Sequence, residues 1–126
     1  MKTGKIKPNG VILQPHKLKT VVFLTELGYN IELIPKSNIY GIHTPDIKMS
    51  GISWEIKCPK GEGNSLIKNT LQKAAKQCEN AIVDLRRVKR HQTKCLTELK
   101  KEFYISKRLK RIKIITKSHK IIDYHK

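Results

Sequence analysis

The feature that most restricts the fold of this sequence is a pair of short alternating runs around the dipeptide Ser50-Gly51. Apolar and polar residues alternate on both sides of it, in Asp46–Met49 and in Ile52–Lys57. Alternation is typical of half-buried strands, and a two-residue turn ending in glycine joins antiparallel strands. The pattern therefore predicts a β-hairpin with one apolar face. That face would carry Ile47, Met49, Ile52, Trp54 and Ile56.

The polar face of this hairpin brings two carboxylates together. The register set by the turn pairs Asp46 with Glu55, and cross-strand partners point to the same face. Lys57 follows on that face. Because adjacent carboxylates repel, we expect a divalent cation, Mg²⁺ or Mn²⁺, between Asp46 and Glu55. Such a cation polarises a phosphoryl oxygen and lowers the pKa of a bound water, and Lys57 would orient that water or stabilise developing negative charge.

The rest of the sequence predicts a mixed α/β domain. Residues 1–10 are basic and contain Pro and Gly, so we expect a flexible arm before a single domain over residues 11–126. Apolar periodicity predicts helices over Pro15–Leu27, Ser65–Asn80 and about Thr93–Leu109, and strands over Tyr29–Ile34, Ala81–Leu85, Ile112–Ile115 and Ile121–Tyr124.

The charge of the chain favours a polyanionic partner. There are 27 Lys and Arg residues against 10 Asp and Glu residues, which gives a formal net charge of +17. Such a field favours nucleic acid, although phosphate contacts alone do not distinguish RNA from DNA. The sequence has no apolar run long enough for a membrane span or a signal peptide. The three cysteines form no CxxC pair, which favours a reducing compartment and hence a cytoplasmic site of action.

The carboxylates and lysine also form a named pattern, since Pro45-Asp46 followed by Glu55-x-Lys57 reads as the PD-(D/E)xK nuclease signature. On its own, a Glu-Lys pair on a strand is most often a solvated ion pair, but the flanking sequence is more specific. It resembles the C-terminal tRNase domain of CdiA-type contact-dependent inhibition toxins over most of the chain from Val11. The resemblance lies in Gly41–Asp46, Gly51–Lys57, Pro59–Gly61, Ala75–Gln77, Asn80, Asp84–Arg87 and Lys110–Lys117.

This resemblance implies a single-domain restriction-endonuclease-like fold, with a mixed central sheet flanked by helices. It also implies metal-dependent hydrolysis of phosphodiester bonds in tRNA or a similar structured RNA. Asp46 and Glu55 would be the metal ligands, Lys57 the catalytic lysine and Gln77 a supporting polar residue. We expect the nucleic acid to contact basic residues around this site, namely His43, Lys48, Lys60, Lys73, Lys76, Arg86, Arg87 and Lys89.

The chain departs from the resemblance at Lys17, where many relatives carry an acidic residue after a Pro-His pair. A cation there would weaken metal binding or replace the charge of the metal. Three functions therefore stay open: an RNA endonuclease, a DNA endonuclease of the same fold, and a catalytically weakened nucleic-acid-binding relative. The toxin resemblance further implies an acidic immunity protein as a partner. It also implies a protein of a mobile element or the tail of a secreted toxin.

Overall fold

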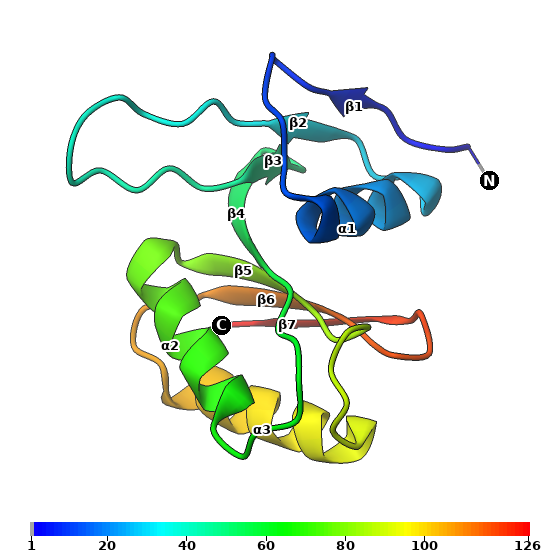
Figure 1. Cartoon of the computed structure of the whole chain (residues 1–126), viewed down its shortest axis with the longest axis vertical. Coiled ribbons are helices and arrows are strands. Elements are labelled where there is room, and N and C mark those ends of the chain that lie inside the picture. Colours follow the sequence, from blue (N-terminus) through cyan, green and yellow to red (C-terminus); the bar gives the residue numbers. More distant parts are fainter. Residues whose placement is uncertain (1) are drawn as a thin grey trace.

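The computed structural model describes residues 2–126, and Met1 lies outside the described residues. Within this range the chain forms one seven-stranded mixed sheet and three helices (Figure 1). The strands are β1 (Ile6–Lys7), β2 (Ile31–Leu33), β3 (Ile47–Met49), β4 (Ile52–Lys57), β5 (Asn80–Asp84), β6 (Arg111–Ile115) and β7 (Ile121–His125). The helices are α1 (Pro15–Glu26), α2 (Leu66–Gln77) and α3 (Gln92–Ile105). This architecture confirms the predicted mixed α/β class.

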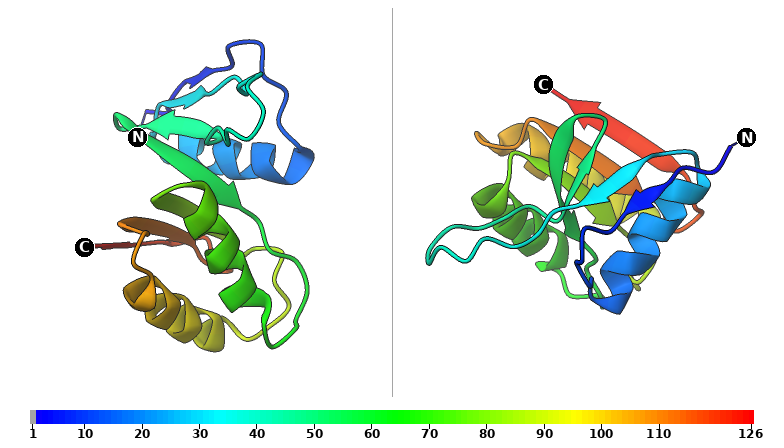
Figure 2. Two further views of the ribbon diagram at one scale, coloured as in Figure 1. Left: turned by 90° about the vertical axis from the view of Figure 1, so that its left-hand side faces the viewer. Right: turned by 90° about the horizontal axis from the view of Figure 1, so that it is seen from above.

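The strands lie in the sheet in the order in which they occur along the chain. The pairs β2–β3, β3–β4 and β6–β7 are antiparallel, whereas β1–β2, β4–β5 and β5–β6 are parallel. Strand β4 therefore links the group formed by β1–β3 and α1 to the group formed by β5–β7, α2 and α3 (Figures 1 and 2). Residues 34–46 form a long loop that extends away from the sheet (Figure 2).

The β3–β4 hairpin has the predicted register. Ile47 pairs with Trp54 and Met49 pairs with Ile52, so the turn consists of Ser50 and Gly51. Both turn residues have positive φ, at 56° and 75°. This is the backbone of a tight hairpin turn whose twist matches that of the flanking strands. The turn chemistry and the alternation therefore determine this part of the fold locally.

The two faces of the sheet are covered by different helices. The apolar face of the hairpin packs with α1 in a cluster that includes Leu24, Ile47, Trp54 and Ile56. The helices α2 and α3 enclose a second cluster on β5 and β6, in which Phe103 is fully buried. Alternate residues of β5 enter different clusters, which is what a strand covered on both faces requires.

The N-terminal residues differ from the flexible arm predicted for residues 1–10. Ile6 and Lys7 form the edge strand β1, parallel to β2. The amide of Gly4 donates to the Thr25 carbonyl at 2.7 Å, and the amide of Lys5 donates to Asn30 Oδ1 at 2.9 Å. A parallel pairing across the length of α1 leaves no local pattern in the sequence, so these contacts could not be predicted from composition.

Several element ends also differ from the prediction. Helix α2 ends at Gln77 rather than Asn80, because Cys78 is already extended and Asn80 begins β5. Helix α3 ends at Ile105 rather than Leu109, since Ser106 is extended. Strand β2 is shorter than the predicted Tyr29–Ile34. None of the helices described in residues 2–126 is both long and apolar enough to cross a membrane.

The packing of α1 gives a direct test of the fold. Leu24 is fully buried against the sheet, whereas Leu18 of the same helix is 43% exposed. We expect Leu24→Ala to lower the free energy of unfolding by about 2–5 kcal/mol, because it leaves a cavity. The matched Leu18→Ala variant should lose less than about 1 kcal/mol. Equal losses in urea denaturation would contradict the position of α1.

Candidate active site

Asp46 precedes β3 and is held by the backbone of β4. Its amide donates to the Trp54 carbonyl at 3.1 Å, and its Oδ2 accepts from the Ile56 amide at 2.9 Å. The carboxylate therefore lies along β4, and the regular strand pairing ends at Ile47 instead of continuing to an Asp46–Glu55 pair. The side chain is only 2% exposed. The predicted closeness of the two carboxylates still results, because both carboxylates contact the same lysine.

Glu55 is the other buried carboxylate, and it lies on β4 with 1% of its surface exposed. Its Oε1 lies 3.0 Å from Nε2 of His43, which belongs to the loop at residues 34–46. Its Oε2 lies 3.5 Å from Nζ of Lys57. The structure thus brings Asp46, Glu55, Lys57 and His43 together at one end of β4.

Lys17, in the first turn of α1, joins the two carboxylates. Its Nζ lies 2.9 Å from Asp46 Oδ2 and 3.8 Å from Glu55 Oε2. Lys36 adds another ammonium group, with its Nζ 3.1 Å from Asp46 Oδ1. Two carboxylates are therefore surrounded by three ammonium groups, and the formal charge of this group is +1 before His43 is counted. A buried carboxylate requires such compensation, because desolvation of an unpaired charge costs several kcal/mol.

These contacts keep Asp46 ionised. Burial alone would raise the pKa of Asp46, but the hydrogen bond from the Ile56 amide and the contact with the Lys17 ammonium outweigh it. The pKa of Asp46 therefore lies below its ordinary value of 3.8. The site consequently holds a permanent anion against its cations at neutral pH.

The residues fit an ammonium ion better than a divalent cation. Carboxylate oxygens are suitable ligands for Mg²⁺, but the Nζ of Lys17 lies where a cation shared by Asp46 and Glu55 would bind. Among residues 2–126, the structure gathers no group of three His, Cys, Asp or Glu side chains that could hold a metal ion. A divalent ion would also add to a group of side chains that is already positively charged.

Gln77 lies beside this group rather than within it. It ends α2, and its Oε1 is buried without a hydrogen-bond partner in residues 2–126. Gln77 shares a cavity of about 530 Å³ with His43, Asn80, Arg108 and Arg111. The structure therefore places Gln77 next to the site through His43, and within residues 2–126 no hydrogen bond joins Gln77 to either carboxylate.

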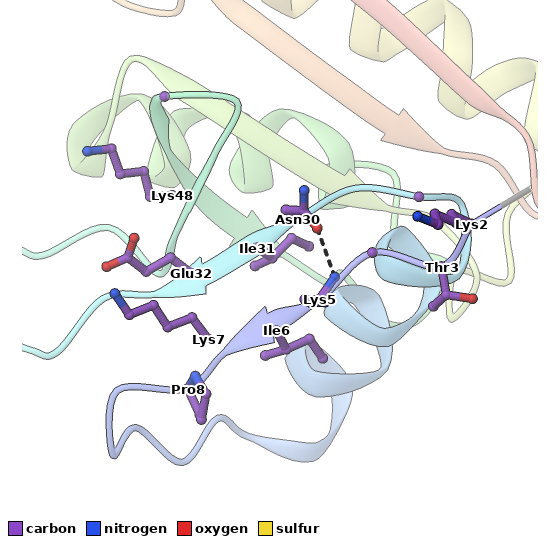
Figure 3. Close-up of a pocket in the computed structure, with 13 residues that line it drawn as sticks. Lys2, Thr3, Lys5, Ile6, Lys7, Pro8, Asn30, Ile31, Glu32 and Lys48 are labelled. Atoms are coloured by element: carbon purple, nitrogen blue, oxygen red, sulfur yellow. Dashed lines mark hydrogen bonds between the residues drawn. The ribbon is translucent and has the colours of Figure 1, made fainter.

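Two of the predicted nucleic-acid contacts have other partners in the structure. Arg86 forms an ion pair with the buried Asp84 at 2.7 Å and lies 4.7 Å over the ring of Phe23. Its guanidinium thus holds α1, and its contact with a phosphate stays a prediction. Lys48 lies on β3 opposite Glu32 and lines a cavity of about 870 Å³ beside β1 (Figure 3). That cavity contains none of the candidate catalytic residues.

The other predicted basic contacts are exposed and come from several elements. Arg87 follows β5 and approaches the start of α1. The pKa of His16 is lowered by burial and by the positive charges of Arg87 and Lys17. The remaining lysines come from the loop before α2, from α2 itself and from the segment after β5; they are Lys60, Lys73, Lys76 and Lys89.

The sequence reasoning did not identify Lys36. This residue follows β2, whose antiparallel pairing with β3 places Leu33 opposite Ile47. The chain that leaves β2 therefore passes beside Asp46, and the Ile34 amide donates to the Asp46 carbonyl at 3.1 Å. Prediction of the β2–β3 pairing would have identified Lys36 as a neighbour of Asp46.

Comparison with known proteins bears on this site. The family model of the contact-dependent growth inhibition CdiA C-terminal domain matches residues 43–121, which is more than half of the chain. The chain belongs to this family. The matched region of this CdiA C-terminal domain includes Asp46, Glu55, Lys57 and Gln77, whereas Lys17 and Lys36 lie before it.

The fold agrees with this assignment. A chain of a solved CdiA-CT/CdiI toxin and immunity complex from Burkholderia pseudomallei superposes with a TM-score of 0.73 at 17% identity. The superposition covers 98% of this chain and 100% of that one. At this identity the likeness shows a shared fold. A search of curated protein sequences gave no match.

The ion pair that anchors α1 predicts a pH dependence of stability. Burial would raise the pKa of Asp84, but hydrogen bonds from Arg86 and Thr20 lower it below 3.8. A carboxyl with a lower pKa in the folded chain stabilises the fold above its ordinary pKa, and this contribution is lost as pH falls through the folded-state value.

We therefore expect Asp84→Asn to lower the free energy of unfolding by about 1–3 kcal/mol at pH 7. The difference between the variant and the wild type should shrink as the pH falls below about 4, because the carboxyl of the unfolded wild-type chain then becomes protonated, and it should vanish once the pH passes the lower folded-state pKa. Urea denaturation at pH 7 and pH 3 measures both values, with the exposed Glu62→Gln as control. A difference that grows as the pH falls would contradict the assignment.

Proposed function

We propose that this CdiA C-terminal domain is a toxin endonuclease that cleaves phosphodiester bonds in tRNA or a similar structured RNA. The observation that carries the proposal is the convergence of Asp46, Glu55 and Lys57 with Lys17 at one end of β4. The PD-(D/E)xK assignment made from the sequence is part of this proposal. A buried charge cluster with partly exposed cations is typical of sites that stabilise a charged transition state.

The cations of the cluster can bind a phosphate without leaving their carboxylates. The side chains of Lys17 and Lys57 are each 19% exposed, so their ammonium groups retain donors toward the solvent. Asp46 and Glu55 hold these groups in fixed positions. The hydrogen bond to Glu55 orients the ring of His43, whose side chain is 37% exposed. A phosphodiester held here would meet two fixed cations and one oriented imidazole.

The surface around the cluster supports binding of a long polyanion. The lysines of α2 and of the loops before it and after β5 are exposed, and the net charge is +17. Association with RNA should therefore be strongly salt-dependent. The divalent cofactor, Mg²⁺ or Mn²⁺, stays a prediction. It would require Lys17 to move away from the carboxylates.

Substitution of Glu55 gives the test of this function. We expect Glu55→Gln to reduce tRNA cleavage by roughly 100-fold or more, because the substitution removes the charge that fixes Lys57 and His43. The exposed Glu62→Gln is the matched control and should retain the wild-type rate. Cleavage is measured on total tRNA and on supercoiled plasmid, each with Mg²⁺, Mn²⁺ or EDTA.

Three outcomes of this assay would contradict the proposal. Cleavage that is unchanged in Glu55→Gln would mean that the chemistry lies elsewhere. Nicking of plasmid without cleavage of tRNA would favour the DNA endonuclease. Salt-sensitive binding of both polymers without cleavage of either would indicate a nucleic-acid-binding relative.

We also propose an acidic immunity protein that covers the site at Asp46 and Glu55. The net charge of +17 and the toxin family support this partner. We expect Lys36→Glu, which reverses the charge of an exposed lysine beside Asp46, to weaken binding of a protein that protects cells from the toxin by about tenfold or more. Lys101→Glu on α3 is the control and should bind normally. A neutral partner that is insensitive to Lys36→Glu would contradict the proposal.

A further inference from the structure

We infer that the ammonium group of Lys17 replaces the divalent cation of this site, and that RNA is cleaved without metal by attack of its own 2′-hydroxyl group. This inference rests on the proposed function and specifies its chemistry. It is carried by the position of Lys17 between the two buried carboxylates. It also explains why a chain with a lysine at this position keeps the rest of the charge cluster.

Lys17 occupies the position that neutralises both acidic residues. Its Nζ lies 2.9 Å from Asp46 and 3.8 Å from Glu55, and both carboxylates are nearly inaccessible to solvent. Lys36 adds a contact to Asp46 at 3.1 Å, and Lys57 adds one to Glu55 at 3.5 Å. Because the ammonium groups already compensate the repulsion between the carboxylates, binding of Mg²⁺ would add little electrostatic stabilisation.

The backbone of α1 holds Lys17 in this position. Thr20, three residues later, donates from Oγ1 to Asp84 Oδ2 at 2.6 Å. Arg86, which is paired with Asp84, donates to the carbonyl of Lys19 at 3.2 Å. The start of α1 is thus tied to the end of β5 by hydrogen bonds. This fixes the backbone position of Lys17, so a metal ion could displace the ammonium group only by rotation of the lysine side chain away from both carboxylates.

A site without a metal-bound water needs another nucleophile, and RNA carries one beside each phosphate. In the proposed step the 2′-oxygen forms a bond to phosphorus and the bond from phosphorus to the 5′-oxygen breaks. The electron pair of that bond leaves with the 5′-oxygen. The products are a 2′,3′-cyclic phosphate and a 5′-hydroxyl, and no water or oxidant is consumed.

His43 and Lys57 are placed to move the two protons of this step. With Nε2 of His43 donating to Glu55, its Nδ1 carries the lone pair that accepts the proton of the 2′-hydroxyl. The ammonium of Lys57 gives a proton to the leaving 5′-oxygen. Lys17 stays charged throughout and stabilises the phosphorane oxygens. Solvent then restores the original protonation of His43 and Lys57.

This chemistry selects RNA over DNA. DNA has no 2′-hydroxyl group, so it can bind the basic surface but cannot react by this route. The inference therefore makes a definite choice between the RNA and DNA endonucleases that the charge alone leaves open.

The test uses the full chain and a tRNA transcript whose cleavage position has been mapped. We expect the rate to change by less than about twofold between EDTA and Mg²⁺, and the products to end in 2′,3′-cyclic phosphate and 5′-hydroxyl. A single 2′-deoxy nucleotide at the cleavage position should abolish cutting there. These three measurements use the wild-type protein and do not depend on the folding of a variant.

Two variants complete the test. Lys17→Ala should lower the rate by roughly 100-fold, whereas Lys19→Ala, an exposed lysine of the same helix, should not change it. Cleavage that requires Mg²⁺ and leaves a 5′-phosphate would overturn the inference and leave the proposed RNA endonuclease in place. Cleavage that is unaffected by Lys17→Ala would also overturn it. No cleavage of RNA under any condition would overturn both the inference and the proposed function.

Discussion

The fold of this CdiA C-terminal domain depends on compensating two carboxylates that are buried beside each other. Asp46 and Glu55 are almost inaccessible, and each would be destabilising without a cation. The required charges come from three separate parts of the chain. Lys17 comes from α1, Lys36 from the loop after β2 and Lys57 from the end of β4 itself. The charge cluster therefore joins these elements and forms the candidate site.

Strand β4 and the end of β5 connect the two groups of strands and helices. Strand β4 pairs with β3 on one side and with β5 on the other, so it belongs to both halves of the sheet. Asp84, at the end of β5, is bound by Thr20 and Arg86 and ties α1 to the second half. The position of Lys17 is thus determined by a second buried charge that takes no part in the proposed chemistry.

Contacts between residues close together in the sequence could be predicted, whereas contacts between distant segments were missed. The register of the hairpin could be predicted because the Ser50-Gly51 turn and the alternation lie within twelve residues. The parallel strand β1 has no such pattern, since its partner lies beyond α1. For the same reason the ion pair of Lys36 was missed. The resemblance implied a phosphate contact for Arg86, but nothing in the sequence indicated its ion pair with the buried Asp84.

The measurement that tests the central claim most directly is a crystal structure grown in Mg²⁺ with an RNA that carries a 2′-O-methyl group at the cleavage position. The account predicts that the Nζ of Lys17 stays between Asp46 and Glu55, and that the phosphate contacts Lys17 and Lys57. It also predicts that the blocked 2′-oxygen lies beside His43. A Mg²⁺ ion bound between the carboxylates at about 2.1 Å, with Lys17 displaced, would contradict the account.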